Sequence, residues 1–139
     1  MKKITSSTVI GFSLLLLTAC SRSNSVTANT TQVVTSGTWS ISLFTDNGND
    51  ETSNFTGFRF AFNTNGILSV QKNGITQSGT WSVDETSNIF NIDLGPKDNT
   101  NQPLGNLTDN WLIISKSNNL ISLMDNNPSS NELLYFIRN

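Results

Sequence analysis

The chain has 139 residues, a formal net charge of -2 at pH 7 and only 13% charged residues. It contains one cysteine and no histidine. This composition excludes an intramolecular disulfide, a zinc site built from cysteine and histidine, and a Ser-His-Asp catalytic triad.

The first twenty residues have the layout of a secretory signal. Lys2 and Lys3 precede an apolar stretch at 9–19, and the sequence Leu17-Thr18-Ala19-Cys20 follows the pattern of a cleavage site. An uncleaved membrane anchor is the alternative, but the stretch is shorter than the about 20 apolar residues that cross a bilayer. We therefore predict a signal peptide over residues 1–19, which leaves enough chain for one domain.

Leu17-Thr18-Ala19-Cys20 resembles the lipobox of bacterial lipoproteins. The resemblance implies that Cys20 is acylated and becomes the first residue of the mature protein, which is then attached to a membrane by its lipid. Stable attachment needs more than one acyl chain. In that family a serine after the cysteine, here Ser21, implies the outer membrane. We expect the protein in the cell envelope, facing the periplasm.

Residues 20–36 hold this cysteine and a polar segment rich in serine, threonine and asparagine. Such a composition is typical of a flexible tether. We therefore place the folded domain at 37–139. In the alternative interpretation, Gln32-Val33-Val34 already begins the first strand and shortens the tether.

From Gly37 onward the sequence alternates between strand patterns and turn signals. Aromatic residues at every second position of Phe58-Arg59-Phe60-Ala61-Phe62 place their rings on one face of a strand. Asn65-Gly66 and Asn73-Gly74 predict tight hairpin turns, because both residue types tolerate positive φ, and Asn118-Asn119 is a weaker signal. The predicted strands cover 37–44, 56–63, 66–72, 75–83, 88–94, 109–116, 119–125 and 132–138.

Short strands joined by tight turns predict an all-β fold. We expect a single eight-stranded antiparallel up-and-down β-barrel, because closure removes the exposed edges of the sheet, and a β-sandwich is the alternative. Residues 95–108 hold two of the three prolines and have no strand pattern. They predict the longest connection, either a turn of helix or a flap over one end of the barrel.

A short repeat surrounds two of the three tryptophans. Ser36-Gly37-Thr38-Trp39-Ser40-Ile41 recurs as Ser78-Gly79-Thr80-Trp81-Ser82-Val83. Two copies do not make a β-propeller, which needs about four blades or more. We expect each glycine to let the backbone bend and each tryptophan to fill the barrel.

Gly37-Thr38-Trp39 also resembles the Gly-x-Trp motif of lipocalins and related calycin barrels. Together with the lipobox, it makes the chain similar to lipocalin-like bacterial lipoproteins. The resemblance implies a lipocalin-like barrel from Gly37 to Arg138, with Arg138 as the candidate residue to cap Trp39. The long helix and the disulfides of that family are missing from this sequence.

Alternation along the strands predicts which side chains point into the barrel. The predicted inward residues are Trp39, Ile41, Leu43, Phe58, Phe60, Phe62, Leu68, Val70, Trp81, Val83, Phe90, Ile92, Leu94, Trp111, Ile113, Ile121, Leu123, Tyr135 and Ile137. Arg59 alternates to the outside. A barrel of this size holds either packed side chains or one small ligand.

These two interiors correspond to two functions. In the first, the lipoprotein binds a small hydrophobic ligand. The candidate pocket residues are then Trp39, Phe58, Phe60, Phe62, Gln77, Trp81, Phe90, Trp111 and Tyr135. In the second, a structural or interaction lipoprotein with a solid core contacts an envelope protein or a glycan.

Other kinds of site are not indicated. The cations are scattered, which argues against binding to nucleic acid. Asp46–Glu51 offers oxygen ligands for calcium, but it lacks the EF-hand spacing and has the composition of an ordinary turn. No carboxylate pair stands out for glycoside hydrolysis. We predict no metal, no cofactor and no enzymatic activity.

Overall fold

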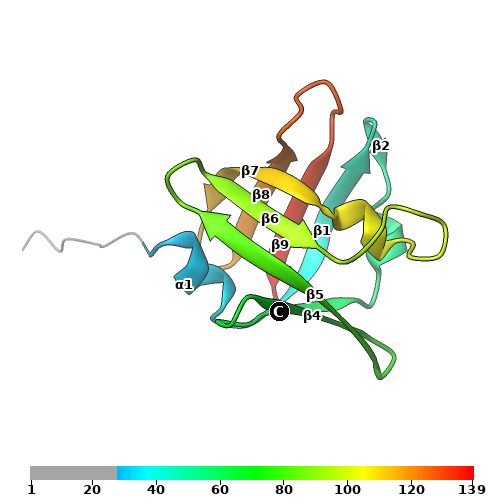
Figure 1. Ribbon diagram of the computed structural model, residues 1–139, viewed down its shortest axis with the longest axis horizontal. Coiled ribbons are helices and arrows are strands. Elements are labelled where there is room, and N and C mark those ends of the chain that lie inside the picture. The colour runs from blue at the N-terminus through cyan, green and yellow to red at the C-terminus, as the bar shows by residue number, and fades with distance from the viewer. Residues whose placement is uncertain (1–27) are drawn as a thin grey trace, which may run out of the picture.

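The computed structural model describes residues 28–139 (Figure 1). The predicted signal peptide, Cys20 and the first part of the predicted tether lie outside these residues. Between Ala28 and Asn139, no helix has the length and apolar character needed to cross a membrane.

Antiparallel strands close into an up-and-down barrel of eight strands, with one additional two-residue strand, β2 (Figure 1). Each barrel strand neighbours the next one along the chain, and β1 pairs with β9 to complete the cylinder. The strands are β1 (Thr38–Asp46), β2 (Asn49–Asp50), β3 (Arg59–Phe62), β4 (Ile67–Lys72), β5 (Ile75–Asp84), β6 (Ile89–Asp93), β7 (Asp109–Lys116), β8 (Leu120–Asp125) and β9 (Leu133–Arg138). The predicted barrel is confirmed, and the alternative sandwich is not formed.

The pairing between β1 and β3 is the shortest around the barrel. Thr38 pairs with Ala61 and Trp39 pairs with Phe60, whereas β4 and β5 are paired at six positions. Beyond Trp39, β1 instead meets the β2 hairpin and the 3-10 helix η1 (Thr52–Phe55).

The hairpin turns follow the asparagine–glycine signals with one difference. Asn73 and Gly74 have φ values of 52° and 80°, as a type I′ turn requires. Asn47-Gly48 makes the same turn between β1 and β2, so the Asp46–Glu51 segment is a hairpin. Around Asn65-Gly66 only the glycine has positive φ, and its N–H donates to the Asn63 carbonyl, so this turn is not type I′.

Two strands present different side chains to the interior from those predicted. In β1 a register shift between Ile41 and Leu43 reverses the alternation, so that Phe44 is buried and the inward prediction for Leu43 is wrong. In β9 residues 133–137 are all apolar, and the sequence therefore does not show which alternate side chains point into the barrel. Leu134 and Phe136 are fully buried. The inward predictions for Tyr135 and Ile137 are therefore wrong.

A short helix closes one end of the barrel, here called the α1 end. Helix α1 (Thr30–Val34) starts with a capping box between Asn29 and Gln32. Val33 and Val34 are buried in the core, and the Trp39 indole N–H donates to the Val34 carbonyl at 2.8 Å. Residues 29–36, predicted as part of the tether, therefore belong to the folded domain, and the alternative strand at Gln32-Val33-Val34 is a helix.

The 3-10 helix η2 (Leu104–Leu107) covers the opposite end, here called the η2 end (Figure 1). Leu104 and Leu107 are buried, and the Trp111 indole N–H donates to the Leu107 carbonyl at 3.0 Å. The prediction of a turn of helix within residues 95–108 is confirmed. Both ends of the barrel are thus covered by its own chain.

Arg138 at the end of β9 fixes α1 to the barrel. Its guanidinium lies over the Trp39 ring, 4.9 Å from the centroid, and this is the contact that the family resemblance implied. The same group donates to the Val33 carbonyl at 2.9 Å and to Ser36 Oγ at 2.6 Å.

Candidate functional site

Aromatic rings fill the middle of the barrel. The Phe62 ring from β3 lies 5.5 Å from Phe136 of β9 and 5.4 Å from Phe90 of β6, measured between centroids. Phe44 of β1 reaches Trp111 of β7 at 6.5 Å. Rings from well-separated strands therefore meet edge to face in the space that a central ligand would occupy.

The predicted pocket residues fall into two groups. Six are buried in this core: Trp39, Phe60, Phe62, Trp81, Phe90 and Trp111. Phe58 is half-buried, with Lys72 Nζ 4.3 Å from its ring centroid. Gln77 donates to the Leu94 carbonyl and to Asn101 Oδ1 at 2.9 and 3.0 Å. Tyr135 points outward, because Leu134 and Phe136 on either side of it are the residues of β9 that point inward. The structure thus does not bring all nine together around one cavity.

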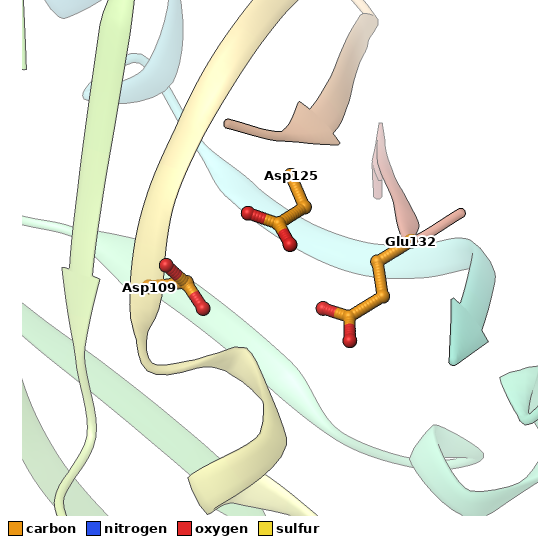
Figure 2. A group of neighbouring side chains, drawn as sticks. All are labelled: Asp109, Asp125 and Glu132. Atoms are coloured by element: carbon orange, nitrogen blue, oxygen red, sulfur yellow. The ribbon is translucent and has the colours of Figure 1, made fainter. Parts of the chain in front are cut away.

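Three carboxylates from separate strands meet at the η2 end (Figure 2). Asp109 begins β7, Asp125 ends β8, and Glu132 directly precedes β9. One oxygen atom of each lies within 4.8 Å of the others. The interior, apolar at its centre, therefore becomes acidic at this mouth.

The acidic cluster is partly compensated by its surroundings. Lys97 Nζ forms an ion pair with Asp109 Oδ2, and the Asn127 backbone N–H donates to Asp125 Oδ1 at 3.0 Å. Burial raises the pKa of Glu132, and the charge of Asp125 adds to this against the opposite effect of Lys97. Within the cluster, Lys97 neutralises the charge of Asp109.

We expect Glu132→Gln to stabilise the protein at neutral pH. Because the folded-state pKa of Glu132 is raised, its stabilising contribution is complete below the ordinary value of 4.5 and is lost as the pH rises through the folded-state pKa. At neutral pH the ionised Glu132 carboxylate therefore costs stability. Glutamine has no charge and removes this cost, which for a partly exposed charge is a few tenths to about 1 kcal/mol. Urea unfolding measures the gain near neutral pH, and about one unit below the ordinary pKa the two proteins should be equally stable. Equal stability at neutral pH would contradict the prediction.

A polar groove of about 470 Å³ lies across the outside of β5, β6 and β7. In the strand register Ser82 lies opposite Asn91, and Asn91 lies opposite Asn110. Asn91 Nδ2 donates to Ser82 Oγ at 3.0 Å. Thr80 and Asp93 form the next cross-strand pair of the groove. This surface offers small donors and acceptors side by side, as a ligand rich in hydroxyl groups would need.

A smaller recess of about 230 Å³ lies at the η2 end and is mostly apolar. Its lining includes Phe58, Val70, Lys72, Ile75 and Leu104. The Lys72 ammonium over the Phe58 ring places a positive charge beside the apolar walls. It is open to solvent at the rim and is separate from the packed centre of the barrel.

Sequence reasoning missed the acidic cluster because its members are distant in the chain. Asp109, Asp125 and Glu132 each lie two positions from a fully buried apolar residue of the same segment. Once the inward phase of a strand is known, this spacing places each carboxylate at the mouth of the barrel. The two-residue spacing could therefore have located the cluster from the sequence. In β9, however, the sequence did not show which side chains face inward.

No protein-family model matches the chain. No curated protein matches it either. Among solved structures, it is similar to the crystal structure of a DUF4847 family protein from Bacteroides vulgatus, with a TM-score of 0.57 and 18% sequence identity. The similarity covers 78% of this chain and 96% of that protein. At this level of identity, the comparison shows a common barrel fold.

Proposed function

We propose that this chain is a lipocalin-like envelope lipoprotein, anchored to the outer membrane through Cys20 and facing the periplasm, whose barrel is a non-enzymatic interaction module. The observation that carries the interaction role is the filled interior, where rings such as Phe62 and Phe136 are in contact. A barrel packed in this way offers partners its outer surface. The lipobox sequence and the contact of Arg138 with Trp39 support the family resemblance.

The polar groove is the proposed binding surface, and a glycan is the class of partner that fits it. Ser82, Asn91 and Asn110 present hydroxyl and amide groups in one row. When such groups bind a polyol, their hydrogen bonds to water are replaced by hydrogen bonds to the ligand. Each replacement contributes a net free energy of about 0.5–1.5 kcal/mol. Several are therefore needed for measurable affinity, and a row of neighbouring side chains supplies them.

Binding of a small apolar ligand is a second candidate function. Its site would lie at the rim of the barrel and not, as predicted from the sequence, at the centre. The recess around Phe58 and Leu104 supports it, because its walls are apolar and Lys72 adds one cation. An amphipathic molecule with an anionic end matches this chemistry.

Native mass spectrometry and NMR of the unlipidated mature chain (residues 20–139, Cys20→Ser), purified from its own host, separate the two candidates. The glycan proposal expects soluble muropeptides to shift the amide resonances of Ser82, Asn91 and Asn110. The apolar alternative expects a copurified lipid and shifts around Phe58 and Lys72. If neither ligand class shifts any resonance, both candidates fail.

Anchoring has its own test in Cys20→Ser expressed in the host. Since the lipid requires the thiol, we expect the variant to move from the membrane fraction to the soluble fraction. Ser21→Ala, next to it, is the matched control and should stay with the membrane. An unchanged distribution of Cys20→Ser would refute the anchor.

A further inference from the structure

The outside of the barrel is apolar on one side. In β7, β8 and β9 the outward residues include Leu112, Ile114, Met124, Leu133, Tyr135 and Ile137, which together are called the apolar face. Leu112 lies opposite Met124, and Met124 lies opposite Leu133, so that one apolar row crosses all three strands. The side chains of Ile114 and Ile137 are 50% and 45% exposed.

This face contrasts with the polar groove. The outer positions of β5 and β6 carry small polar residues such as Ser82 and Asn91, as expected for the solvated side of an antiparallel sheet. The apolar face contains no charged residue, and an open recess of about 310 Å³ adjoins it at Met124 and Leu133. Ser115 and Ser122 lie between its two apolar rows. Apolar patches of a few hundred Å² are often contact surfaces for another protein or a membrane.

The chain enters the fold at the α1 end of the barrel, where two strands of this face end. Thr30, at the start of α1, is fully buried, and its backbone N–H and its hydroxyl both donate to the Glu85 carboxylate. Lys116, the last residue of β7, donates to Thr30 Oγ1 at 2.9 Å and pairs with Glu85 at 3.2 Å. Arg138, the last residue of β9, binds the other end of α1. The first folded residues are therefore fixed to the ends of two strands that carry the apolar face.

The remaining length of chain limits how far the membrane lies from this point. Cys20 precedes Ala28 by eight residues. Even a fully extended chain of this length spans at most about 28 Å. A lipid on Cys20 thus keeps the bilayer within about 28 Å of Ala28.

The size of the face favours a membrane over a second copy of the chain. Strand spacing and rise give the outer side of β7, β8 and β9 a combined area of roughly 300 Å². A standard protein interface takes about 800 Å² from each partner. A lipid-anchored protein needs less, because its acyl chains already supply the attachment.

We infer that the apolar face lies against the lipid bilayer, so that the barrel rests on its side. This orientation depends on the anchoring proposed at Cys20. Ile114 and Ile137 enter the interfacial region of the lipid, and burial of their exposed surface holds the orientation.

Vesicle partitioning of the mature chain carrying Cys20→Ser tests the face without its lipid. With zwitterionic phosphatidylcholine vesicles at millimolar lipid, we expect measurable cosedimentation. The double variant Ile114→Ser/Ile137→Ser should lower the partition coefficient about tenfold or more, because half-exposed isoleucines lose their apolar contact. Ile67→Ser is the matched control: Ile67 is 41% exposed on β4, across the barrel from β8, and should partition like the parent chain.

Thermal unfolding of each variant verifies that it is folded before partitioning is compared. No cosedimentation of the parent chain, or equal partitioning of both isoleucine variants, would overturn the inference. A dimer in analytical ultracentrifugation that the double variant abolishes would also overturn it, because a second copy then covers the face. Failure of the anchor appears only in the fractionation of Cys20→Ser, since the vesicle assay does not use the lipid.

Discussion

Phe62→Ala is expected to lower the free energy of unfolding by about 3–5 kcal/mol. The ring is 2% exposed and contacts Trp81, Phe90 and Phe136 edge to face. Its removal costs the burial of the ring and leaves a cavity that edge-to-face neighbours cannot easily fill. Urea unfolding measures the loss, and the half-buried Phe58→Ala should lose less than Phe62→Ala.

The same variant tests the filled interior. A dry apolar cavity takes up small apolar molecules, so we expect benzene to raise the melting temperature of Phe62→Ala and not that of the parent protein. Stabilisation of the parent protein by benzene to the same extent would show that its interior already has room for a ligand. The interaction role proposed from the filled interior would then lose its main support.

Gly79→Ala is expected to destabilise the barrel by about 2–4 kcal/mol. A Cβ atom at this position would lie 2.1 Å from the Asp93 carbonyl oxygen and 3.0 Å from Leu94 Cα. Both are backbone atoms where β6 meets the following loop, so they cannot move aside as a side chain would. Glycine is therefore required at this position of β5 because the backbone of residues 93–94 approaches so closely.

Gly37→Ala is the matched control within the repeated sequence. Its Cβ would meet the flexible Arg138 side chain at 3.4 Å, which is ordinary contact distance. We expect a change in unfolding free energy within about 0.5 kcal/mol. Equal losses at Gly37 and Gly79 in chemical denaturation would contradict this explanation of the second glycine.

Strand positions were predictable where local pattern and tertiary packing agree. The alternation in Phe58–Phe62 predicted a strand with buried Phe60 and Phe62, as observed. In β9 five consecutive apolar residues concealed the phase, and a register shift in β1 reversed it after Ile41. Helix α1 was missed in a polar segment, although Asn29 and Gln32 have the spacing of a capping box.

The surfaces that the proposals use were harder to predict than the core. The acidic cluster consists of residues at the ends of three strands, and these ends come together only when the strands pair in the closed barrel. The apolar face had one local signal: a strand apolar at every position, such as Leu133–Ile137, is typical of a strand covered on both sides. The predicted inward set considered only one side of this strand, and its two wrongly placed members in β9, Tyr135 and Ile137, belong to the outer face.

The short pairing of β1 with β3 gives the barrel a preferred place to open. Local opening free energies are lowest where few backbone hydrogen bonds must break, and this junction has two paired positions. One of them is Trp39, and Arg138 connects Trp39 to α1 by lying over its ring and donating to the Val33 carbonyl. If the anchor proposed at Cys20 holds the chain, tension on it would reach α1 and, through the contacts of Val34 and Arg138 with Trp39, the junction between β1 and β3.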